Sequence, residues 1–390
     1  MEWAFSALGV IVFVIIVIYS INAVKRKSYG ASKTEKPNVG INIENDEKLL
    51  KAAEAGDVEA KLKLAEACKF KDSGKYIYWL EKAAEQDCDE AVRTLAEEYE
   101  HGNSSAVPPI KKDKEKAVEY FTRLAEKGDA EAMKSISLIY FVDYNDEAKA
   151  REWTEKAAEA GDIESMIELG DDYRLNSDIE DFDKAEYWYK KAADAGSGDA
   201  MKGLGDLYCY DEKRYDYFKA EGWYKKAVAA GDYFGYVRLG DMCKEGKGCA
   251  KDAGAAFAYY QKAADEGEVY GKIRTAEAYL SGEGVGRDKE KAVSILQSAA
   301  EKSIIPKYRL GLCYYEGDGV KKDYKRAAEL FNECVKFEPK AMNKLGECYY
   351  FGYGVKEDKE KAKDLWRKAA KIGNTDAKES LKLYFRETVE

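Results

Sequence analysis

The chain has 390 residues, of which 35% are charged, and its formal net charge is −10. Binding to nucleic acid depends on clustered cations that neutralise phosphates, so this acidic balance argues against a nucleic-acid partner. The single histidine, His101, argues against catalytic triads, histidine general bases and most zinc sites.

The first predicted element is the apolar run WAFSALGVIVFVIIVIYSINAV at residues 3–24, which is followed directly by Lys-Arg-Lys at residues 25–27. About twenty apolar residues span a bilayer as a helix, and adjoining cations mark the side that stays in the cytoplasm. A cleaved signal peptide is the alternative, but it would carry cations before a shorter apolar core, and only two residues precede this one. We therefore expect residues 1–24 to be a single-pass membrane anchor, with the N-terminus outside and the rest of the chain in the cytoplasm.

Residues 25–43 form the second predicted segment. The basic residues at its start are followed by SYGASKTEKPNVGINI, which is polar, contains Gly and Pro and shows no helical period. Such a composition is typical of a flexible linker. We expect a basic juxtamembrane segment and a tether here.

The remainder, residues 44–390, repeats a pattern with a period of about 35 residues, which indicates stacked supersecondary units. A Leu-Gly-like pair recurs, as at Leu204, Leu239, Leu310 and Leu345, and a Lys-Ala-Ala-like element precedes each pair. Apolar residues within a unit recur at i, i+3, i+4 and i+7, which is the spacing of one face of a helix. Each unit is therefore predicted to contain two helices.

The stretch EGDGVKKD, at residues 316–323, raises the question of a ligand loop. A phosphate loop needs a preceding strand, and a calcium loop needs oxygen ligands at fixed alternate positions, and neither context is present. The same Gly-x-Gly turn recurs in other units, as in FGYGVKED. We therefore predict that it is the turn inside a helical hairpin.

Together these motifs, as in LGECYYFGYGVKEDKEKAKDLWRKAAKIG from Leu345 to Gly373, resemble the Sel1-like repeat family, a relative of the tetratricopeptide repeat. The resemblance covers about residues 44–390. It implies an all-α fold, a right-handed α/α superhelical solenoid of roughly nine to ten helix-turn-helix repeats. It also implies binding to other proteins, in bacterial signalling and host interaction or as an adaptor of a membrane ubiquitin ligase in the endoplasmic reticulum.

Nothing in the sequence singles out catalytic, cofactor-binding or metal-binding residues, so we expect a protein that is not an enzyme and that needs no cofactor. The eight cysteines include no Cys-x-x-Cys pair and follow no regular spacing, and we interpret them as reduced packing thiols. A hydrolase is a less favoured alternative, because no nucleophile and base can be identified.

A protein-binding groove is predicted on the first helices of the later units. At 100° per residue, positions five before, two before, two after and five after the repeat Leu lie opposite the face that carries that Leu. In the C-terminal half these positions are apolar, aromatic or acidic, as a docking surface for an apolar segment requires. The candidate residues are Phe234, Val237, Asp241, Tyr270, Ile273, Glu277, Leu280, Ile305, Tyr308, Tyr315, Glu347 and Tyr350. The alternative is that they pack between neighbouring first helices, with Arg238–Asp241, Arg274–Glu277 and Lys344–Glu347 as ordinary i,i+3 pairs.

The sequence therefore predicts a membrane-anchored scaffold or adaptor that binds a protein or peptide on the cytoplasmic side. The alternative is a lumenal or extracytoplasmic adaptor, which requires the opposite topology.

Overall fold

The computed structural model describes residues 47–176, 179–211 and 214–388. Over these ranges the chain forms twenty α-helices and, apart from the isolated bridge between Asn103 and Ile110, no β-structure. This confirms the predicted all-α class. None of the helices in the described ranges has the length and apolar character needed to cross a membrane. The predicted anchor at 1–24 and tether at 25–43 lie outside the described residues.

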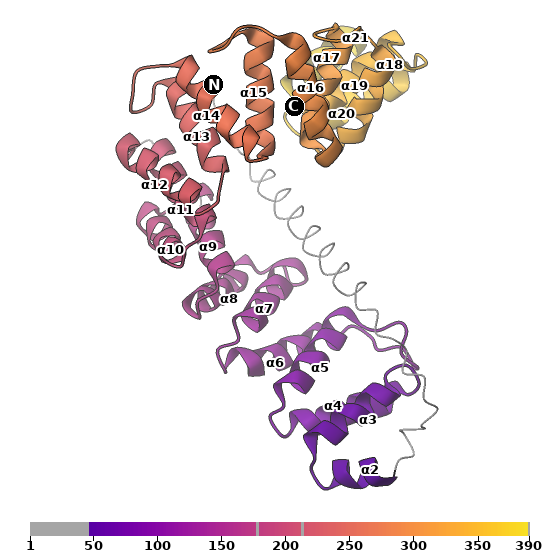
Figure 1. Cartoon of the computed structure of the whole chain (residues 1–390). Helices are drawn as coiled ribbons and strands as arrows, with labels where there is room; N and C mark the ends of the chain where they lie inside the picture. The colour runs from indigo at the N-terminus through magenta and orange to yellow at the C-terminus, as the bar shows by residue number, and fades with distance from the viewer. Residues whose placement is uncertain (1–46, 177–178, 212–213, 389–390) are drawn as a thin grey trace. The chain divides into compact units, whose positions relative to one another are not determined.

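The chain divides into two compact units, the first of which ends at Ala195. Its helices follow one another in chain order, each packed against the next (Figure 1). They are α2 (Glu47–Glu54), α3 (Val58–Cys68), α4 (Ser73–Ala84), α5 (Asp89–His101), α6 (Lys114–Ala125), α7 (Ala130–Val142), α8 (Glu147–Glu159), α9 (Ile163–Leu175) and α10 (Phe182–Asp194).

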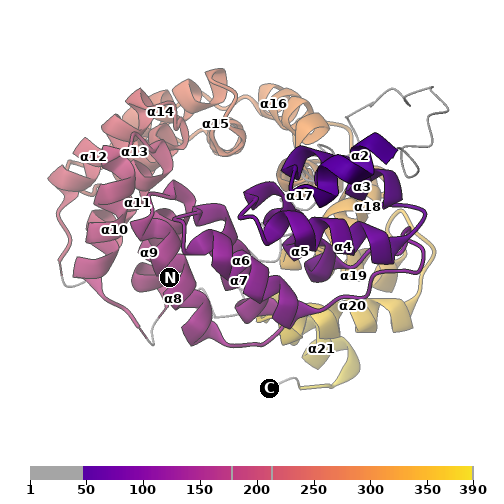
Figure 2. The same cartoon turned by 90° about the horizontal axis from the view of Figure 1, so that it is seen from below.

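The second unit begins at Gly196. Its helices are α11 (Gly198–Tyr210), α12 (Tyr217–Ala229), α13 (Phe234–Glu245), α14 (Ala253–Asp265), α15 (Val269–Ser281), α16 (Lys289–Lys302), α17 (Ile305–Glu316), α18 (Tyr324–Cys334), α19 (Pro339–Phe351), α20 (Lys359–Lys371) and α21 (Thr375–Phe385). Consecutive helices of this unit again lie side by side in both views (Figure 2).

Within the described residues, the two units contain nine helical hairpins, from α3–α4 to α19–α20, with α2 and α21 as single helices before and after them. In each hairpin we call the earlier member the first helix and the later member the second helix. The second helices begin at a capping aspartate. Asp252, Asp288, Asp323 and Asp358 each accept a hydrogen bond of 2.9 Å from the backbone N–H three residues ahead. Such caps satisfy donors that the first turn of a helix leaves unpaired.

In five of the nine described hairpins, the core forms where a Leu-Gly pair of the first helix meets an aromatic ring of the second. Leu204 and Tyr224 are completely buried. A Cβ atom added at Gly205 would lie less than 3.0 Å from three ring atoms of Tyr224. A Cβ at Gly170 or Gly346 would likewise lie less than 3.0 Å from three ring atoms of Tyr189 or Trp366. A Cβ at Gly240 or Gly311 would lie less than 3.0 Å from two ring atoms of Tyr260 or Phe331. The glycine after the repeat Leu therefore makes room for the ring on which the hairpin closes.

The Gly-x-Gly segment is the hairpin turn, as predicted. Between α17 and α18, Gly317 has φ +80° and Gly319 has φ +70°, in the left-handed region that favours glycine. A Cβ at Gly319 would also collide with the backbone carbonyl of Lys289, at the start of α16 in the preceding hairpin. The turn therefore serves two purposes, because it reverses the chain and also packs against the neighbouring repeat.

Candidate protein-binding surface

The predicted groove residues all lie on first helices of the second unit. Helix α13 carries Phe234, Val237 and Asp241, and α15 carries Tyr270, Ile273, Glu277 and Leu280. Helix α17 carries Ile305, Tyr308 and Tyr315, and α19 carries Glu347 and Tyr350. Their positions relative to the repeat Leu divide them into four groups with different roles.

The positions two before the repeat Leu are buried. Val237 is 2% exposed, Ile273 7% and Tyr308 9%. Each belongs to an apolar cluster that includes residues of a second helix, and the Tyr308 ring lies 6.0 Å from that of Phe331. Burial raises the pKa of Tyr308 to about 12, because the phenolate would lose its hydration. These three side chains stabilise the stack and offer little surface to a partner.

The positions five before the repeat Leu are accessible. Tyr270 is 44% exposed and Ile305 is 46% exposed, while Phe234 is half-buried. The rings of Phe234 and Tyr270 meet edge to face with centroids 5.4 Å apart, and the Arg238 guanidinium lies 5.1 Å from the Phe234 ring centroid. Phe234, Tyr270 and Ile305 stand at the N-terminal ends of three successive first helices. We call these three residues the apolar edge.

The positions five after the repeat Leu are half-buried and pack locally. The Tyr315 hydroxyl donates to Glu347 at 3.2 Å, and the Tyr315 ring lies 5.2 Å from that of Tyr324. Tyr350 packs against Tyr384 with ring centroids 4.5 Å apart. Leu280 lies against the cluster around Ile273. These side chains are therefore part of the packing between hairpins, with one edge open to solvent.

The acidic side chains two residues after the repeat Leu form hydrogen bonds and ion pairs within the protein. Asp206, one unit upstream of the candidate residues, is 4% exposed. It accepts from the Tyr224 hydroxyl at 2.8 Å and from the Arg238 Nη2 at 3.0 Å. Burial opposes the charged form of Arg238, but the Asp206 carboxylate outweighs it and raises the arginine pKa above its ordinary value. The bond joins the first helices α11 and α13.

The next acids repeat this arrangement. Asp241 accepts from the Tyr260 hydroxyl at 2.7 Å and lies 3.6 Å from Arg274 Nε. Glu277 pairs with Arg274 at 3.2 Å and with Arg309 of α17 at 2.8 Å. These contacts form a ladder of charges that links successive first helices.

Two of the three predicted i,i+3 pairs are present. Arg274 pairs with Glu277, and Lys344 pairs with Glu347 at 2.9 Å. The predicted pair between Arg238 and Asp241 was wrong, because Arg238 pairs with Asp206 of the preceding hairpin. The sequence did contain a signal for this ladder, because an arginine stands one residue before the repeat position at 239, 275 and 310.

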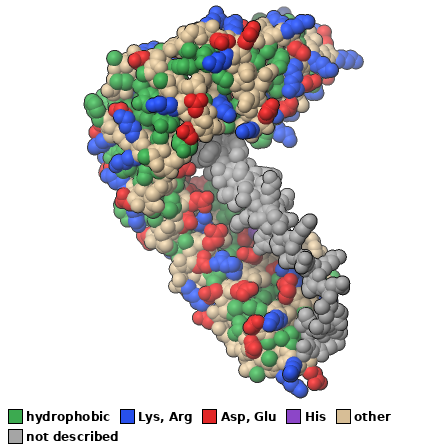
Figure 3. Space-filling view, viewed as in Figure 1, with side chains coloured by type: hydrophobic (Ala, Val, Ile, Leu, Met, Phe, Trp, Pro, Cys, Tyr) green, Lys and Arg blue, Asp and Glu red, His purple; other side chains and the backbone are tan. Residues whose placement is uncertain are grey.

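The charge on the surface is mixed. On the face that Figure 3 shows, lysine and arginine side chains are interspersed with aspartate and glutamate. In the part of the chain that the structure describes, no group of three or more His, Cys, Asp or Glu side chains could hold a metal ion. All eight cysteines are free thiols, and Cys249 is exposed.

Comparison with known proteins identifies the repeat. A family model for the Sel1 repeat matches nine segments, at residues 71–88, 90–129, 139–162, 163–197, 198–232, 234–268, 270–303, 307–333 and 339–374. No curated protein matches the chain.

Two solved structures carry the same kind of repeat. A Sel1 repeat protein from Oxalobacter formigenes is 27% identical over 80% of this chain and 92% of that chain, with a TM-score of 0.56. A protective antigen of uropathogenic Escherichia coli strains, which displays an SLR fold, is 25% identical over 87% of this chain and 82% of that chain, with a TM-score of 0.48.

Proposed function

Because the chain belongs to the Sel1 repeat family, we propose that its repeat domain is a protein-interaction scaffold and that a protein or peptide partner contacts the apolar edge of Phe234, Tyr270 and Ile305. The observation that carries this proposal is the exposure of Tyr270 and Ile305, at 44% and 46%, on successive first helices. Clustered aromatic and aliphatic side chains of this kind supply most of the binding energy in protein interfaces. The proposed function involves no catalytic step.

The membrane arrangement is a further part of the proposal. Residues 1–24 would anchor the chain, residues 25–43 would act as a tether, and the solenoid of 44–390 would lie in the cytoplasm. The apolar run with its following cations supports this orientation. The eight free thiols also support it, since disulfides are rare in reducing compartments. A lumenal or extracytoplasmic adaptor is the competing arrangement.

The scaffold proposal is tested by capturing partners with the full-length chain and comparing two variants. The double variant Tyr270→Ser with Ile305→Ser removes accessible apolar side chains, so it should lose the partner while the melting temperature changes by no more than a few degrees. Tyr308→Ser is the matched core control, because its side chain is buried and its loss should lower the melting temperature. Partner capture that survives the double variant would remove the apolar edge from the proposal.

The orientation is tested with a membrane-impermeant maleimide, which should reach the exposed Cys249 only from the cytoplasmic side of sealed membranes. Labelling from the opposite side would favour the lumenal or extracytoplasmic adaptor. Release of the chain from membranes by carbonate would contradict the anchor.

A further inference from the structure

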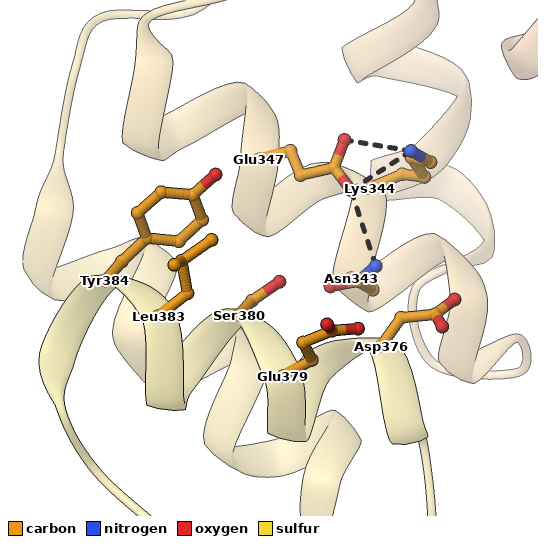
Figure 4. Close-up of a pocket in the computed structure, with 8 residues that line it drawn as sticks. All are labelled: Asn343, Lys344, Glu347, Asp376, Glu379, Ser380, Leu383 and Tyr384. Atoms are coloured by element: carbon orange, nitrogen blue, oxygen red, sulfur yellow. Dashed lines mark hydrogen bonds and ion pairs between the residues drawn. The ribbon is translucent and has the colours of Figure 1, made fainter.

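A pocket of about 290 Å³ lies between the first helix α19 and the last helix α21, away from the residues of the apolar edge. Asn343, Lys344 and Glu347 line it from α19 (Figure 4). The α21 side is lined by Asp376, Glu379, Ser380, Leu383 and Tyr384. The volume lies just below the usual range for small-molecule sites, which suits a single side chain better than a larger ligand.

Asn343 supplies a buried acceptor that has no partner. The residue is 4% exposed, and its side-chain Oδ1 has no hydrogen-bond donor within the described residues. Its Nδ2 donates to Glu347 at 3.4 Å, which directs the carbonyl end of the amide away from that carboxylate. The backbone carbonyl of Asn343 accepts from Trp366 Nε1 at 3.1 Å, so the residue is held in place. A buried acceptor without a partner costs free energy that a bound donor would recover.

The charges around this acceptor favour a cation. Among the described residues, Lys344 is the only basic one that lines the pocket, and both carboxylate oxygens of Glu347 lie within 3.0 Å of its ammonium group. Asp376 and Glu379 are exposed, and neither has an ion-pair partner in the described part of the chain. Figure 4 shows their side chains on the same side of α21 as Ser380, near Asn343. The pocket therefore offers acceptors and net negative charge, and its one ammonium group is already neutralised.

One end of the pocket is apolar. Leu383 is 68% exposed, and Tyr384 is fixed by ring contacts with Tyr350 at 4.5 Å and Trp366 at 5.6 Å. A long side chain with an aliphatic stem and a cationic head would place its stem against Leu383 and Tyr384 and its head among the acceptors. Lysine and arginine side chains have this combination of an apolar stem and a charged end.

We propose that this pocket binds a lysine or arginine side chain of the protein partner. The head would donate to Asn343 Oδ1 and to the carboxylates of Asp376 and Glu379. The inference rests on the proposed scaffold function and adds the chemistry of one contact. An anionic group is excluded by the repulsion of the unpaired carboxylates.

The test measures binding of a short acetylated and amidated peptide with one central Lys among Gly and Ser residues, labelled with fluorescein, to the full-length protein by anisotropy. The same peptide with norleucine keeps the stem and loses the charge. Asp376→Asn with Glu379→Gln removes both free carboxylates. Glu360→Gln with Asp364→Asn is the matched control, because it removes the same charge from exposed positions of α20 that do not line the pocket. This control separates a specific site from general attraction to an acidic protein.

We expect the Lys peptide to bind at least about tenfold more tightly than the norleucine peptide. Each free carboxylate should contribute up to about fivefold, as exposed ion pairs do, so the double variant should lose on the order of tenfold while the control variant loses less than about twofold. Equal binding of both peptides, or an unchanged affinity in the double variant, would overturn the proposal. Melting temperatures of both variants verify that the fold is intact.

The same variants distinguish the two proposals. If the variant Asp376→Asn with Glu379→Gln binds a captured partner with unchanged affinity, the lysine or arginine contact is refuted and the scaffold function is retained. If the Lys peptide binds at the pocket but no protein is captured, the scaffold function is refuted and the binding site for a cationic side chain is retained.

Discussion

At the scale of single residues, five of the described hairpins depend on the absence of a side chain at one position. Gly205 faces the ring of Tyr224, and the ring fills the space that a Cβ would need. Protein interiors are packed so densely that one added methyl group has to be accommodated by moving neighbours. Tyr224 has little freedom to move, because it is completely buried and its hydroxyl is bonded to Asp206.

Gly205→Ala should therefore destabilise the protein by about 1–3 kcal/mol, the usual cost of overpacking a core. Gly222→Ala is the matched control, since Gly222 is also inside a helix, is exposed and has nothing within 4 Å of its added Cβ. That change should stabilise the protein by roughly 0.4–1 kcal/mol, because alanine loses less backbone freedom on folding. Urea unfolding midpoints of the unmodified protein, Gly205→Ala and Gly222→Ala measure both effects on stability. A neutral effect of Gly205→Ala would mean that the ring shifts freely.

Much of this could be predicted from the sequence, since the period identifies the repeat and the Leu-Gly pair marks the first helix. The pattern left two alternatives for Val237, Ile273 and Tyr308, and their burial against second helices favours packing in the stack over an open groove. A helix in a solenoid has first helices on both sides, so a residue opposite the hairpin core can still be covered by a neighbouring repeat. The bond between Arg238 and Asp206 could not be predicted from the sequence either, because it depends on how successive hairpins are stacked.

The pocket between α19 and α21 required the structure for a different reason. Asn343 and Asp376 are far apart in the sequence, and nothing in the spacing indicates that they line one space. Asn343 falls at the same repeat position as Val237 and Ile273, where the pattern predicts no buried amide. Only the three-dimensional arrangement shows that the amide nitrogen has a partner while the amide oxygen has none among the described residues.

At the scale of elements, helices α17, α18 and α19 each bury a thiol. Cys313, Cys334 and Cys348 are at most 2% exposed. Burial, which disfavours the thiolate, raises the pKa of Cys313 to about 11 and the pKa values of Cys334 and Cys348 to about 12, from an ordinary value of 9.0. The neutral thiols behave as small apolar groups that fill the space between neighbouring helices.

These shifts predict a loss of stability at alkaline pH. A thiol whose pKa is higher in the folded state contributes stability that is fully present below about pH 9 and is lost as the pH rises through 11 to 12, because the unfolded chain releases its proton first. At pH 10.5, about 1–2 kcal/mol per buried thiol should be lost relative to pH 8.

Urea unfolding at pH 8 and pH 10.5 measures this loss. Lysine and tyrosine titrate in the same range, so the informative quantity is the difference between proteins. Cys348→Ala should show a smaller fall between the two pH values than the unmodified chain. Equal falls in the two proteins would contradict the prediction.

At the scale of the whole molecule, a repeat architecture distributes its stability over neighbouring contacts. Hairpins are stabilised by contacts between their own two helices and by bonds to adjacent hairpins, such as the pair between Glu277 and Arg309. Stability in such a chain is approximately a sum of repeat terms and nearest-neighbour terms, so a local defect can open a few repeats and leave distant ones folded. The last hairpin offers a sharp case, because Trp366 forms the centre of a cluster that joins α20 and α21.

Trp366→Ala should therefore unfold one end of the chain before the rest. Trp366 is completely buried, and its removal should cost about 3–5 kcal/mol through lost burial and the cavity that remains. We expect amide hydrogen exchange to accelerate in α19, α20 and α21, with protection in α3 to α8 unchanged. Ile136→Ala is the matched control, since Ile136 is also completely buried and lies in α7 of the other unit, so its loss should accelerate exchange around α7 and leave α19 to α21 protected. A uniform loss of protection along the chain in both variants would show that the solenoid unfolds as one cooperative body, because a nearest-neighbour chain cannot transmit a single defect over that many repeats without local opening.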